Sequence, residues 1–420
     1  MPTCSLARLP GRRGFTSLLL AFLAAGCIGD TSVSEQDALG EQLGSMPYLT
    51  WVSASDLEKS GVVQIDRDRA SPGLNLYSPR NRPQAILMDL DGEIVHSWRA
   101  VVEPGDTWQH VELLPDGELL AVVAERRLLK VDSKSKVVWT LDKPFHHDIA
   151  VSEVGRIYSI LRGERSVDIN GDEVSILDDS IAVISPDGEL LETVSIYDLF
   201  GDQVPASRWK HVKRWQSRSD TIEAANKRRE KGEFPFPHGS PVDLFHTNSV
   251  EIIPRDVDGV ARKGDLLISL RELDQIAVLD LENRAIRWRW GPGILRKQHQ
   301  PTLLDNNNIL VFDNKGAGKK ISRVIELDPR SGEIVWEYVA DPPRSFYSAL
   351  RSGNERLPNG NTLITESDKG RAFEVTVDGE RVWEFYVPII NREKKSRVSV
   401  YRMTRLPVSA KELDWSSTSP

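Results

Sequence analysis

The segment AILMDLDGEIVHSW, residues 85–98, is an alternating apolar run, an Asp-Gly turn and a second run that ends on tryptophan. Five later segments share this pattern of strand, turn and strand ending on an aromatic or other large residue: 128–139, 181–194, 276–290, 324–338 and 372–385. Alternation around a short polar turn is the strongest local signal for a β-hairpin. The sequence therefore predicts six hairpins of one kind.

Further pairs of strand-like runs lie between these hairpins, for example TLLDNNNILVFD at 302–313 and ERLPNGNTLITE at 355–366. Each repeat thus offers four strands, and repeats recur at roughly 40 to 50 residues, the spacing of propeller blades. The first repeat lacks its opening strand, and VYRMTRLP at 400–407 supplies a matching segment. We predict an all-β, six-bladed β-propeller closed by this C-terminal strand, because an open ring would leave two unpaired sheet edges. A β-sandwich or an open stack of hairpins is the alternative.

The predicted propeller spans residues 71–410, followed by a tail at 411–420. A polar segment at 200–245 interrupts it between the third and fourth blades, and its middle has helical character. Such an excursion is often a lid or a binding wall. Trp209, Lys210, His211 and Trp215 combine aromatic and cationic or imidazole groups that suit an aryl anion. The formal charge of −8 argues against a nucleic-acid ligand.

The N-terminus has the pattern of an export signal. Three arginines precede an apolar stretch at 15–26, which is too short to cross a bilayer and ends in LAAGC. We expect a signal peptide at 1–26, lipidation of Cys27, and a tether with an N-terminal extension at 27–70. The chain would then be exported and lipid-anchored at the cell envelope, facing the periplasm. Simple secretory cleavage is the alternative, and the Arg12–Arg13 pair also fits a twin-arginine signal.

The chain has two cysteines, Cys4 in the expected signal and Cys27 at its end. With the first removed and the second acylated, no thiolate remains for a disulfide, a metal site or cysteine catalysis.

Four of the eight histidines begin strand-like stretches in one register of the repeat. They are His110, His147, His246 and His299. The first strand of each propeller blade lines the central channel, so these side chains are expected at one mouth. The ends of neighbouring strands should add further polar groups to that mouth, chiefly Arg271, Asn314, Tyr401 and Arg402. Imidazoles, guanidiniums, a phenol and amides together form a site for an oxyanion.

Two other interpretations of the histidines are open. Three or four channel imidazoles are a ligand set for zinc, although Arg271 and Arg402 at the same mouth would repel a dication. Each histidine could instead satisfy a backbone carbonyl in a purely structural role. We predict no metal and no cofactor.

Around these residues the chain resembles a known family. The segments FHHDI at 145–149, DLFHTNSVEIIP at 243–254, LLISLRELDQIAVLD at 266–280 and QHQPTLLDNNNILVFDN at 298–314 are similar to motifs of the bacterial arylsulfate sulfotransferases. The resemblance covers roughly residues 75–405. It implies a six-bladed propeller that moves a sulfuryl group from an aryl sulfate donor to a phenolic acceptor without a nucleotide. No glycine-rich phosphate-binding loop is present in the sequence.

The resemblance also implies roles for individual residues. His299 would be the nucleophile that carries the sulfuryl group as sulfohistidine. His147, His246 and Arg271 would bind the sulfuryl oxygens with help from Asn248. Apart from the resemblance, their expected place at the channel mouth predicts that Asn314, Tyr401 and Arg402 contact substrate.

The chain departs from the family in three respects. It has no disulfide near the nucleophile, no separate N-terminal β-domain, and Gln300 where many relatives carry an acid that would orient the imidazole. The alternatives are a ligand-binding propeller related to quinone-binding dehydrogenases, a scaffold lipoprotein without catalysis, or a metal-dependent propeller enzyme. The oligomeric state is not predicted.

Overall fold

The computed structural model describes residues 50–237, 240–316 and 320–408. The chain divides into two compact units, 1–39 and 40–420, and every described residue belongs to the second. The expected signal peptide, Cys27 and the tail at 411–420 lie outside the described residues. Within the described ranges the fold is all-β with a few helices, and no helix there is long and apolar enough to cross a membrane.

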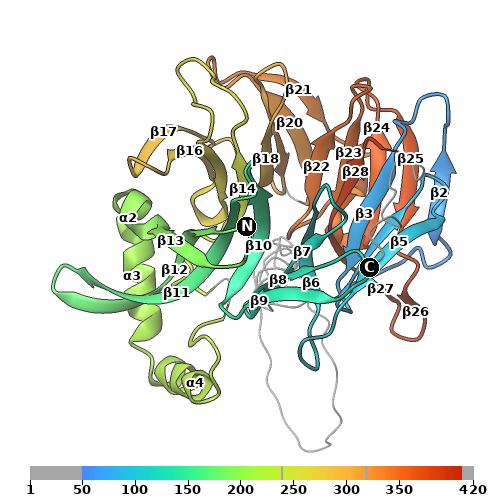
Figure 1. The fold of residues 1–420 in the computed structure, drawn as a ribbon. Coiled ribbons are helices and arrows are strands. Elements are labelled where there is room, and N and C mark those ends of the chain that lie inside the picture. The colour runs from blue at the N-terminus through green and yellow to red at the C-terminus, as the bar shows by residue number, and fades with distance from the viewer. Residues whose placement is uncertain (1–49, 238–239, 317–319, 409–420) are drawn as a thin grey trace, which may run out of the picture. The chain divides into compact units, whose positions relative to one another are not determined.

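Six antiparallel sheets, here numbered I to VI, make up most of the described fold (Figure 1). Sheet I is β28 (Val400–Leu406), β3 (Leu74–Pro79), β4 (Gln84–Met88) and β5 (Ile94–Arg99). Sheet II is β6 (Trp108–Leu113), β7 (Leu119–Val123), β8 (Arg127–Val131) and β9 (Val137–Leu141). Sheet III is β10 (Phe145–Val151), β11 (Ile157–Ile169), β12 (Asp172–Ile184) and β13 (Leu190–Ser195).

The second half of the chain repeats this order. Sheet IV is β14 (Thr247–Ile252), β15 (Leu266–Leu270), β16 (Gln275–Asp280) and β17 (Ala285–Trp290). Sheet V is β18 (His299–Leu303), β19 (Ile309–Asp313), β20 (Arg323–Leu327) and β21 (Ile334–Tyr338). Sheet VI is β22 (Gly353–Arg356), β23 (Thr362–Glu366), β24 (Arg371–Val375) and β25 (Arg381–Tyr386), with β2 (Gly61–Ile65) as a fifth strand. A small sheet joins β1 (Trp51–Ser53), β27 (Ser396–Val398) and β26 (Ile390–Asn391).

All six hairpins predicted from the sequence are present, as β4–β5, β8–β9, β12–β13, β16–β17, β20–β21 and β24–β25. The first shows why the Asp-Gly pattern forms them. The Asp89 carboxylate accepts the backbone N–H groups of Asp91 and Glu93, and Gly92 has a φ of 87°, which favours glycine.

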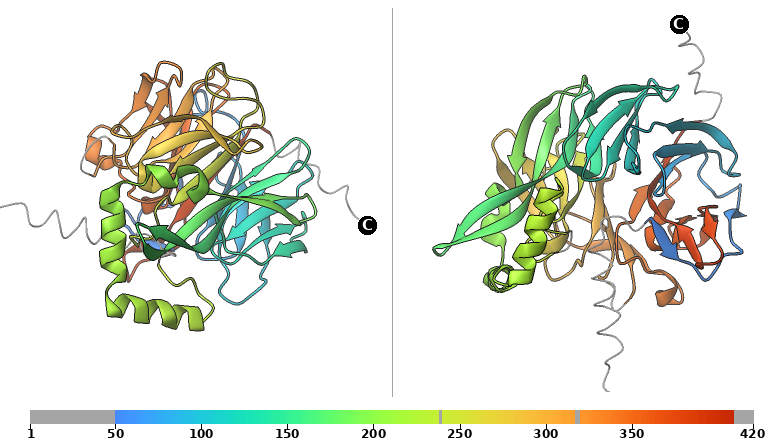
Figure 2. Two further views of the ribbon diagram at one scale, coloured as in Figure 1. Left: turned by 90° about the vertical axis from the view of Figure 1, so that its left-hand side faces the viewer. Right: turned by 90° about the horizontal axis from the view of Figure 1, so that it is seen from below.

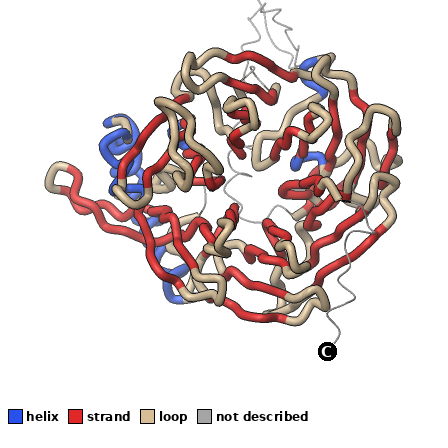
Figure 3. The backbone as a smooth tube through the Cα atoms, turned by 45° about the horizontal axis from the view of Figure 1, so that its top comes forward, coloured by secondary structure: helices blue, strands red, loops and turns tan. Residues whose placement is uncertain are grey.

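The C-terminal strand pairs with the first repeat, as predicted. β28 lies antiparallel to β3, with Val400 opposite Pro79 and Leu406 opposite Leu74. The innermost strands β28, β6, β10, β14, β18 and β22 each contact the innermost strand of the next sheet. Figure 3 shows the sheets side by side around a common axis.

Side chains on five inner strands, β6, β10, β14, β18 and β22, accept hydrogen bonds from the backbone of the next inner strand. The N–H of His147 donates to Gln109 Oε1 at 3.1 Å, that of Val250 to Asp148 Oδ2 at 3.1 Å, and that of Leu303 to Glu251 Oε1 at 2.9 Å. The series continues with Asn354 N–H to Gln300 Oε1 at 3.0 Å and Arg405 N–H to Glu355 Oε2 at 2.8 Å. These bonds satisfy buried backbone donors that no strand ladder reaches.

Tryptophans on the fourth strand of five sheets bond to a turn of the following sheet. The indole N–H of Trp98 donates to Gly117, Trp139 to Pro186, Trp288 to Pro329, Trp336 to Val377 and Trp383 to Leu90. The last of these joins sheet VI to sheet I. Between sheets III and IV an ion pair, Arg284 with Glu192 at 2.9 Å, occupies the corresponding place.

The helical segment predicted near 200–245 follows β13. It contains α2 (Ile196–Phe200), the 3-10 turn η1 (Gly201–Gln203), α3 (Ala206–Gln216) and α4 (Ser219–Glu230). The middle of this segment therefore forms two helices, α3 and α4, and Ser217 caps the C-terminal end of the first. Beside it β11 and β12 extend as a long projecting hairpin (Figure 2).

The aromatic groups of α3 pack inward. The Trp209 ring lies 6.3 Å from Tyr197 and the Trp215 ring 5.4 Å from Phe236, and both tryptophans join the hydrophobic core around sheets III and IV. They pack α3 against the core. The sequence had suggested that these aromatic side chains would instead face a substrate.

Candidate active site

Several inner strands have a break in register at the same end, and this break changes the direction of the site side chains. The register shifts between His146 and Ile149 in β10, between Thr247 and Ser249 in β14, and between His299 and Thr302 in β18. His147, His246 and Gln300 have positive φ angles of 69°, 47° and 43°. Such bulges re-aim side chains, and left-handed residues of this kind cluster at functional sites.

His299 is held in one tautomer. Its Nδ1 lies 2.7 Å from Asn314 Oδ1 and 3.1 Å from the carbonyl oxygen of Lys297. The orientation of the Asn314 amide is fixed because its Nδ2 donates to the carbonyls of Ser348 and Arg351, both at 2.8 Å. With two acceptors facing it, Nδ1 carries the proton, so Nε2 carries the lone pair.

The charge environment keeps this imidazole neutral. Burial, followed by the neighbouring Arg271, holds the pKa of His299 well below its ordinary value. His246 lowers it further. A neutral imidazole with a lone pair on Nε2 is a competent nucleophile near neutral pH.

Arg271 lies immediately after β15, in the 3-10 turn η2 (Arg271–Leu273), and pairs with Glu272. Lys297 Nζ reaches the same carboxylate at 2.7 Å and Arg208 Nη2 of α3 at 3.0 Å. Burial alone would raise the pKa of Glu272, but these three cations hold it at about 2. Three cations therefore share one carboxylate on the side of the site next to His299.

His147 and His246 lie edge to face, with ring centroids 5.1 Å apart. Nδ1 of His246 lies 2.7 Å from Asp243 Oδ2, a contact within the turn that precedes β14. Nδ1 of His147 lies 2.5 Å from Nδ1 of His146, and Nε2 of His146 lies 3.1 Å from Asp179 Oδ1. Each of these two histidines is thus oriented through its Nδ1.

The remaining predicted residues lie deeper among the inner strands. The Tyr401 ring is 6.0 Å from both His147 and His110. Arg402 makes a bidentate, buried contact with Asp148 at 2.9 and 3.3 Å, and Nε2 of His110 lies 3.2 Å from the same carboxylate. Burial, followed by Arg402, lowers the pKa of His110 to about 3. The guanidinium of Arg402 is therefore already paired with the carboxylate of Asp148.

The two amides beside His299 make backbone contacts. Asn248 Nδ2 donates to the carbonyl of Gln298 at 2.9 Å, which ties β14 to the residue before His299. Gln300 joins β18 to β22 through Asn354. The imidazole of His299 is oriented by Asn314, fifteen residues later in the sequence, and not from position 300.

Sequence reasoning missed four groups of the site. His146, Asp243 and Glu272 contact a predicted residue directly, and Asp179 contacts His146. Three of them lie one to three positions along the sequence from a predicted site residue. Closeness in sequence was therefore the signal that could have identified them. Asp179 lies on the extended part of β12, and no local pattern brings it to His146.

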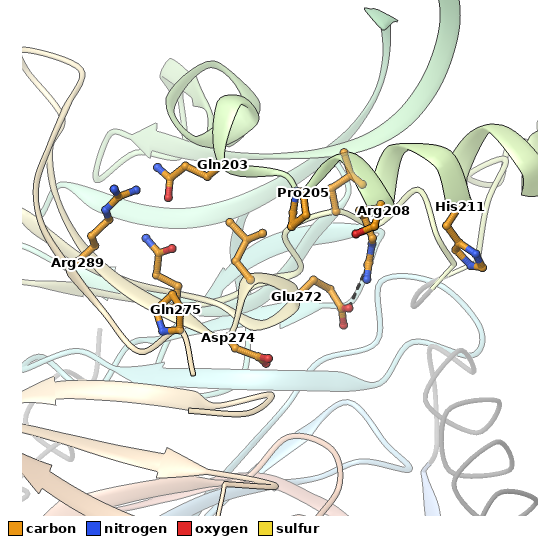
Figure 4. Close-up of a pocket in the computed structure, with 12 residues that line it drawn as sticks. Gln203, Pro205, Arg208, His211, Glu272, Asp274, Gln275 and Arg289 are labelled. Atoms are coloured by element: carbon orange, nitrogen blue, oxygen red, sulfur yellow. Dashed lines mark hydrogen bonds and ion pairs between the residues drawn. The ribbon is translucent and has the colours of Figure 1, made fainter. Parts of the chain in front are cut away.

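A cavity of about 940 Å³ adjoins this site between α3 and the turn after β15. Figure 4 shows Arg208 bonded to Glu272 on its wall, with His211, Asp274 and Arg289 also lining it. Glu272 belongs both to this wall and to the Arg271 cluster. Among the described residues, no group of three or more His, Cys, Asp or Glu side chains is arranged to hold a metal ion.

Comparison with solved structures finds similar folds at low identity. A protein of unknown function from Bacteroides caccae matches with a TM-score of 0.50 and 15% identity, over 79% of this chain and 98% of that one. A streptogramin B lyase matches with a TM-score of 0.43 and 12% identity, over 83% and 90%. Virginiamycin B lyase from Staphylococcus aureus matches with a TM-score of 0.41 and 12% identity, over 78% and 88%. No curated protein matches the chain.

The sequence itself matches a family model. The model described as Arylsulfotransferase (ASST) covers residues 110–388, which is more than half of the chain and includes His147, His246, Arg271 and His299. The chain belongs to the arylsulfotransferase family.

Proposed function

We propose that this protein moves a sulfuryl group from an aryl sulfate to a phenolic acceptor, without a nucleotide, through a sulfohistidine intermediate on His299. Membership of the family implies an aryl sulfate donor and a phenol acceptor. The observation that carries the proposal is the state of His299. Asn314 fixes its tautomer and Arg271 and burial keep it neutral, which leaves a lone pair on Nε2.

The first half-reaction forms a bond from His299 Nε2 to sulfur and breaks the bond from sulfur to the aryl oxygen. The leaving phenolate takes a proton from a second histidine, and Nδ1–H stays hydrogen-bonded to Asn314. In the second half the acceptor phenol gives its proton back to that histidine, and its oxygen attacks sulfur. His299 then leaves with its original tautomer, so atoms and charge balance.

The sulfuryl oxygens gain negative charge during both steps, and fixed cationic donors stabilise it. We assign this role to Arg271 and His246, which are the groups that act electrostatically on His299. Glu272 holds Arg271 in place without neutralising the cluster, because Lys297 and Arg208 share the carboxylate. Asn248 and Tyr401 are proposed to line the path of the aryl groups.

The scaffold that we propose is a closed, six-bladed propeller. The β28–β3 pairing, the sequence of inner-strand contacts and the Trp383 bond from sheet VI to sheet I support it. We also propose that Cys27 is lipidated and anchors the protein at the cell envelope. Replacement of Cys27 by serine should release the protein from the membrane fraction.

The test of the activity uses purified protein, 4-nitrophenyl sulfate and a phenol, with no nucleotide. We expect release of nitrophenol together with formation of the sulfated acceptor, and loss of both in His299→Ala. Equal turnover by wild type and variant would exclude the proposed nucleophile.

A further inference from the structure

His146 and His147 are consecutive in β10, yet their rings touch. In a regular strand consecutive side chains point to opposite faces. The bulge after His146 and the positive φ of His147 bring the two Nδ1 atoms to 2.5 Å, with the rings 4.8 Å apart and nearly perpendicular at 81°. At this separation one proton must lie between the two nitrogens, because two lone pairs would repel.

The far side of His146 fixes which nitrogens carry protons. Its Nε2 lies 3.1 Å from Asp179 Oδ1, and the carboxylate also accepts from Arg162 Nε at 3.2 Å and from the Thr247 N–H at 2.7 Å. Burial would raise the pKa of Asp179, but Arg162 and His146 hold it at about 2. Nε2 of His146 therefore donates to a carboxylate, its Nδ1 accepts from His147, and the chemistry of His147 moves to Nε2.

The charges on this side of the site are the reverse of those around His299. Arg162 is fully buried and faces three carboxylates, Asp179 at 3.2 Å, Glu125 at 3.2 Å and Asp243 at 3.6 Å. Two of these, Asp179 and Asp243, each contact a histidine. One guanidinium among three carboxylates favours an additional proton on the imidazoles. The cations around Glu272 favour a neutral His299 instead, and groups whose environments differ in this way divide into acid and nucleophile.

We propose that His146 is a positioning residue that couples Asp179 to His147, and that His147 Nε2 is the acid–base group of the reaction. The inference rests on the proposed function and names the second histidine of that mechanism. In the first half-reaction Nε2–H of His147 protonates the leaving phenolate, and the His146–His147 pair becomes neutral. In the second half Nε2 takes the proton of the acceptor phenol. Asp179 remains a carboxylate throughout.

The test compares aryl sulfate donors whose leaving phenols differ in basicity, 4-nitrophenyl sulfate and phenyl sulfate. His146→Gln keeps a donor for Asp179 but removes the contact with His147. We expect kcat for phenyl sulfate to fall by about 10²-fold or more, within the range that a proton transfer contributes. The fall for 4-nitrophenyl sulfate should be far smaller, because nitrophenolate leaves without protonation.

Asp179→Asn is the second variant and should give the same dependence on the leaving group. His110→Gln is the matched control, because His110 is also a buried histidine of an inner strand but contacts Asp148. If this variant lowers kcat at all, it should lower kcat for both donors equally. Equal slowing of both donors by His146→Gln and Asp179→Asn would overturn the relay. A wild-type protein that transfers no sulfuryl group would instead refute the proposed function itself.

Discussion

At the scale of single residues, the site separates two kinds of histidine by their surroundings. His299 has an amide oxygen at Nδ1 and Arg271 nearby, whereas His246 has the Asp243 carboxylate and His147 is linked to Asp179 through His146. An amide oxygen fixes a tautomer without adding negative charge. The ring therefore stays neutral, with its proton on Nδ1 and a lone pair on Nε2.

The first prediction concerns Asn314. Asn314→Leu keeps the approximate size but removes the nearer of the two acceptors for His299 Nδ1–H. The Lys297 carbonyl at 3.1 Å remains, and it holds the proton on Nδ1 less firmly than both acceptors together. We expect kcat/KM to fall about 10²-fold or more, since a wrong tautomer alone costs a catalytic histidine up to about 10⁴-fold. Steady-state kinetics with 4-nitrophenyl sulfate measures this.

Asn361→Leu is the matched control for that change. Asn361 is also a buried amide, but it bonds Glu374 and the carbonyl of Arg69. It should lower the melting temperature and leave kcat/KM unchanged. Similar kinetic losses in the two variants would mean that Asn314 acts only through stability.

At the scale of elements, α3 reaches the site through Arg208, which also donates to the carbonyl of Asp243 at 3.1 Å. Arg208 of α3 shares Glu272 with Lys297 and Arg271. Removing one cation should strengthen the hold of Glu272 on Arg271, which then competes with the sulfuryl oxygens. The helix thus acts on the site through Arg208.

Arg208→Ala is accordingly expected to raise KM for the donor by up to about fivefold, equivalent to about 1 kcal/mol for a partly exposed pair. Its kcat should change little. Arg218→Ala serves as the control, because Arg218 pairs with Asp220 on the exposed surface of the same segment. An unchanged KM in Arg208→Ala would show that α3 is not coupled to Arg271.

The elements also show how far sequence patterns reach. The six hairpins were predictable, because alternation and Asp-Gly turns are local signals. The pairing of β28 with β3 was predictable because the first repeat lacks its opening strand and 400–407 supplies a matching segment. The register of the histidines predicted that His147, His246 and His299 lie at strand starts. The bulges that turn their rings together were not visible, because they depend on how neighbouring strands pair. Arg162 and Asp179 lie opposite each other on the extended β11–β12 hairpin. Local sequence patterns do not predict that this hairpin reaches the histidines.

At the scale of the whole molecule, the tryptophan bonds join successive sheets, and the bond from Trp383 to Leu90 joins the last sheet to the first. Trp383 is fully buried and stacks on Phe385 at 6.0 Å. Trp383→Phe removes that hydrogen bond and part of the core volume. We expect the free energy of unfolding in urea to fall by about 2 kcal/mol.

Trp139→Phe is the comparison, because the Trp139 bond to Pro186 between sheets II and III is exposed to solvent. Its loss should cost well under about 1 kcal/mol. Equal losses for the two variants would contradict a special contribution from the junction of sheets VI and I.

Three inner-strand glutamates predict the pH dependence of stability. Burial raises the pKa of Glu112 to about 7, of Glu251 to about 8 and of Glu355 to about 7. A carboxyl with a raised pKa stabilises the fold while protonated, and this contribution is lost as the pH rises through the folded pKa. The buried histidines His110 and His299, whose pKa values are lowered, act in the opposite sense only below about pH 6.5.

The melting temperature should therefore fall between about pH 6.5 and pH 9, across the range in which these glutamates ionise. Glu251→Gln keeps an acceptor for the Leu303 N–H and should flatten this fall, which differential scanning calorimetry can follow. A variant that keeps the full pH dependence of the wild type would show that Glu251 does not titrate in this range.

The most direct test of the central claim is intact-mass measurement of the protein after exposure to 4-nitrophenyl sulfate alone, without an acceptor. The wild type should gain the mass of one sulfuryl group, peptide mapping should locate it on His299, and a phenol added afterwards should remove it. His299→Gln should gain nothing. A wild-type protein that releases nitrophenol without any covalent mass gain, or that carries the group on another residue, would contradict the account.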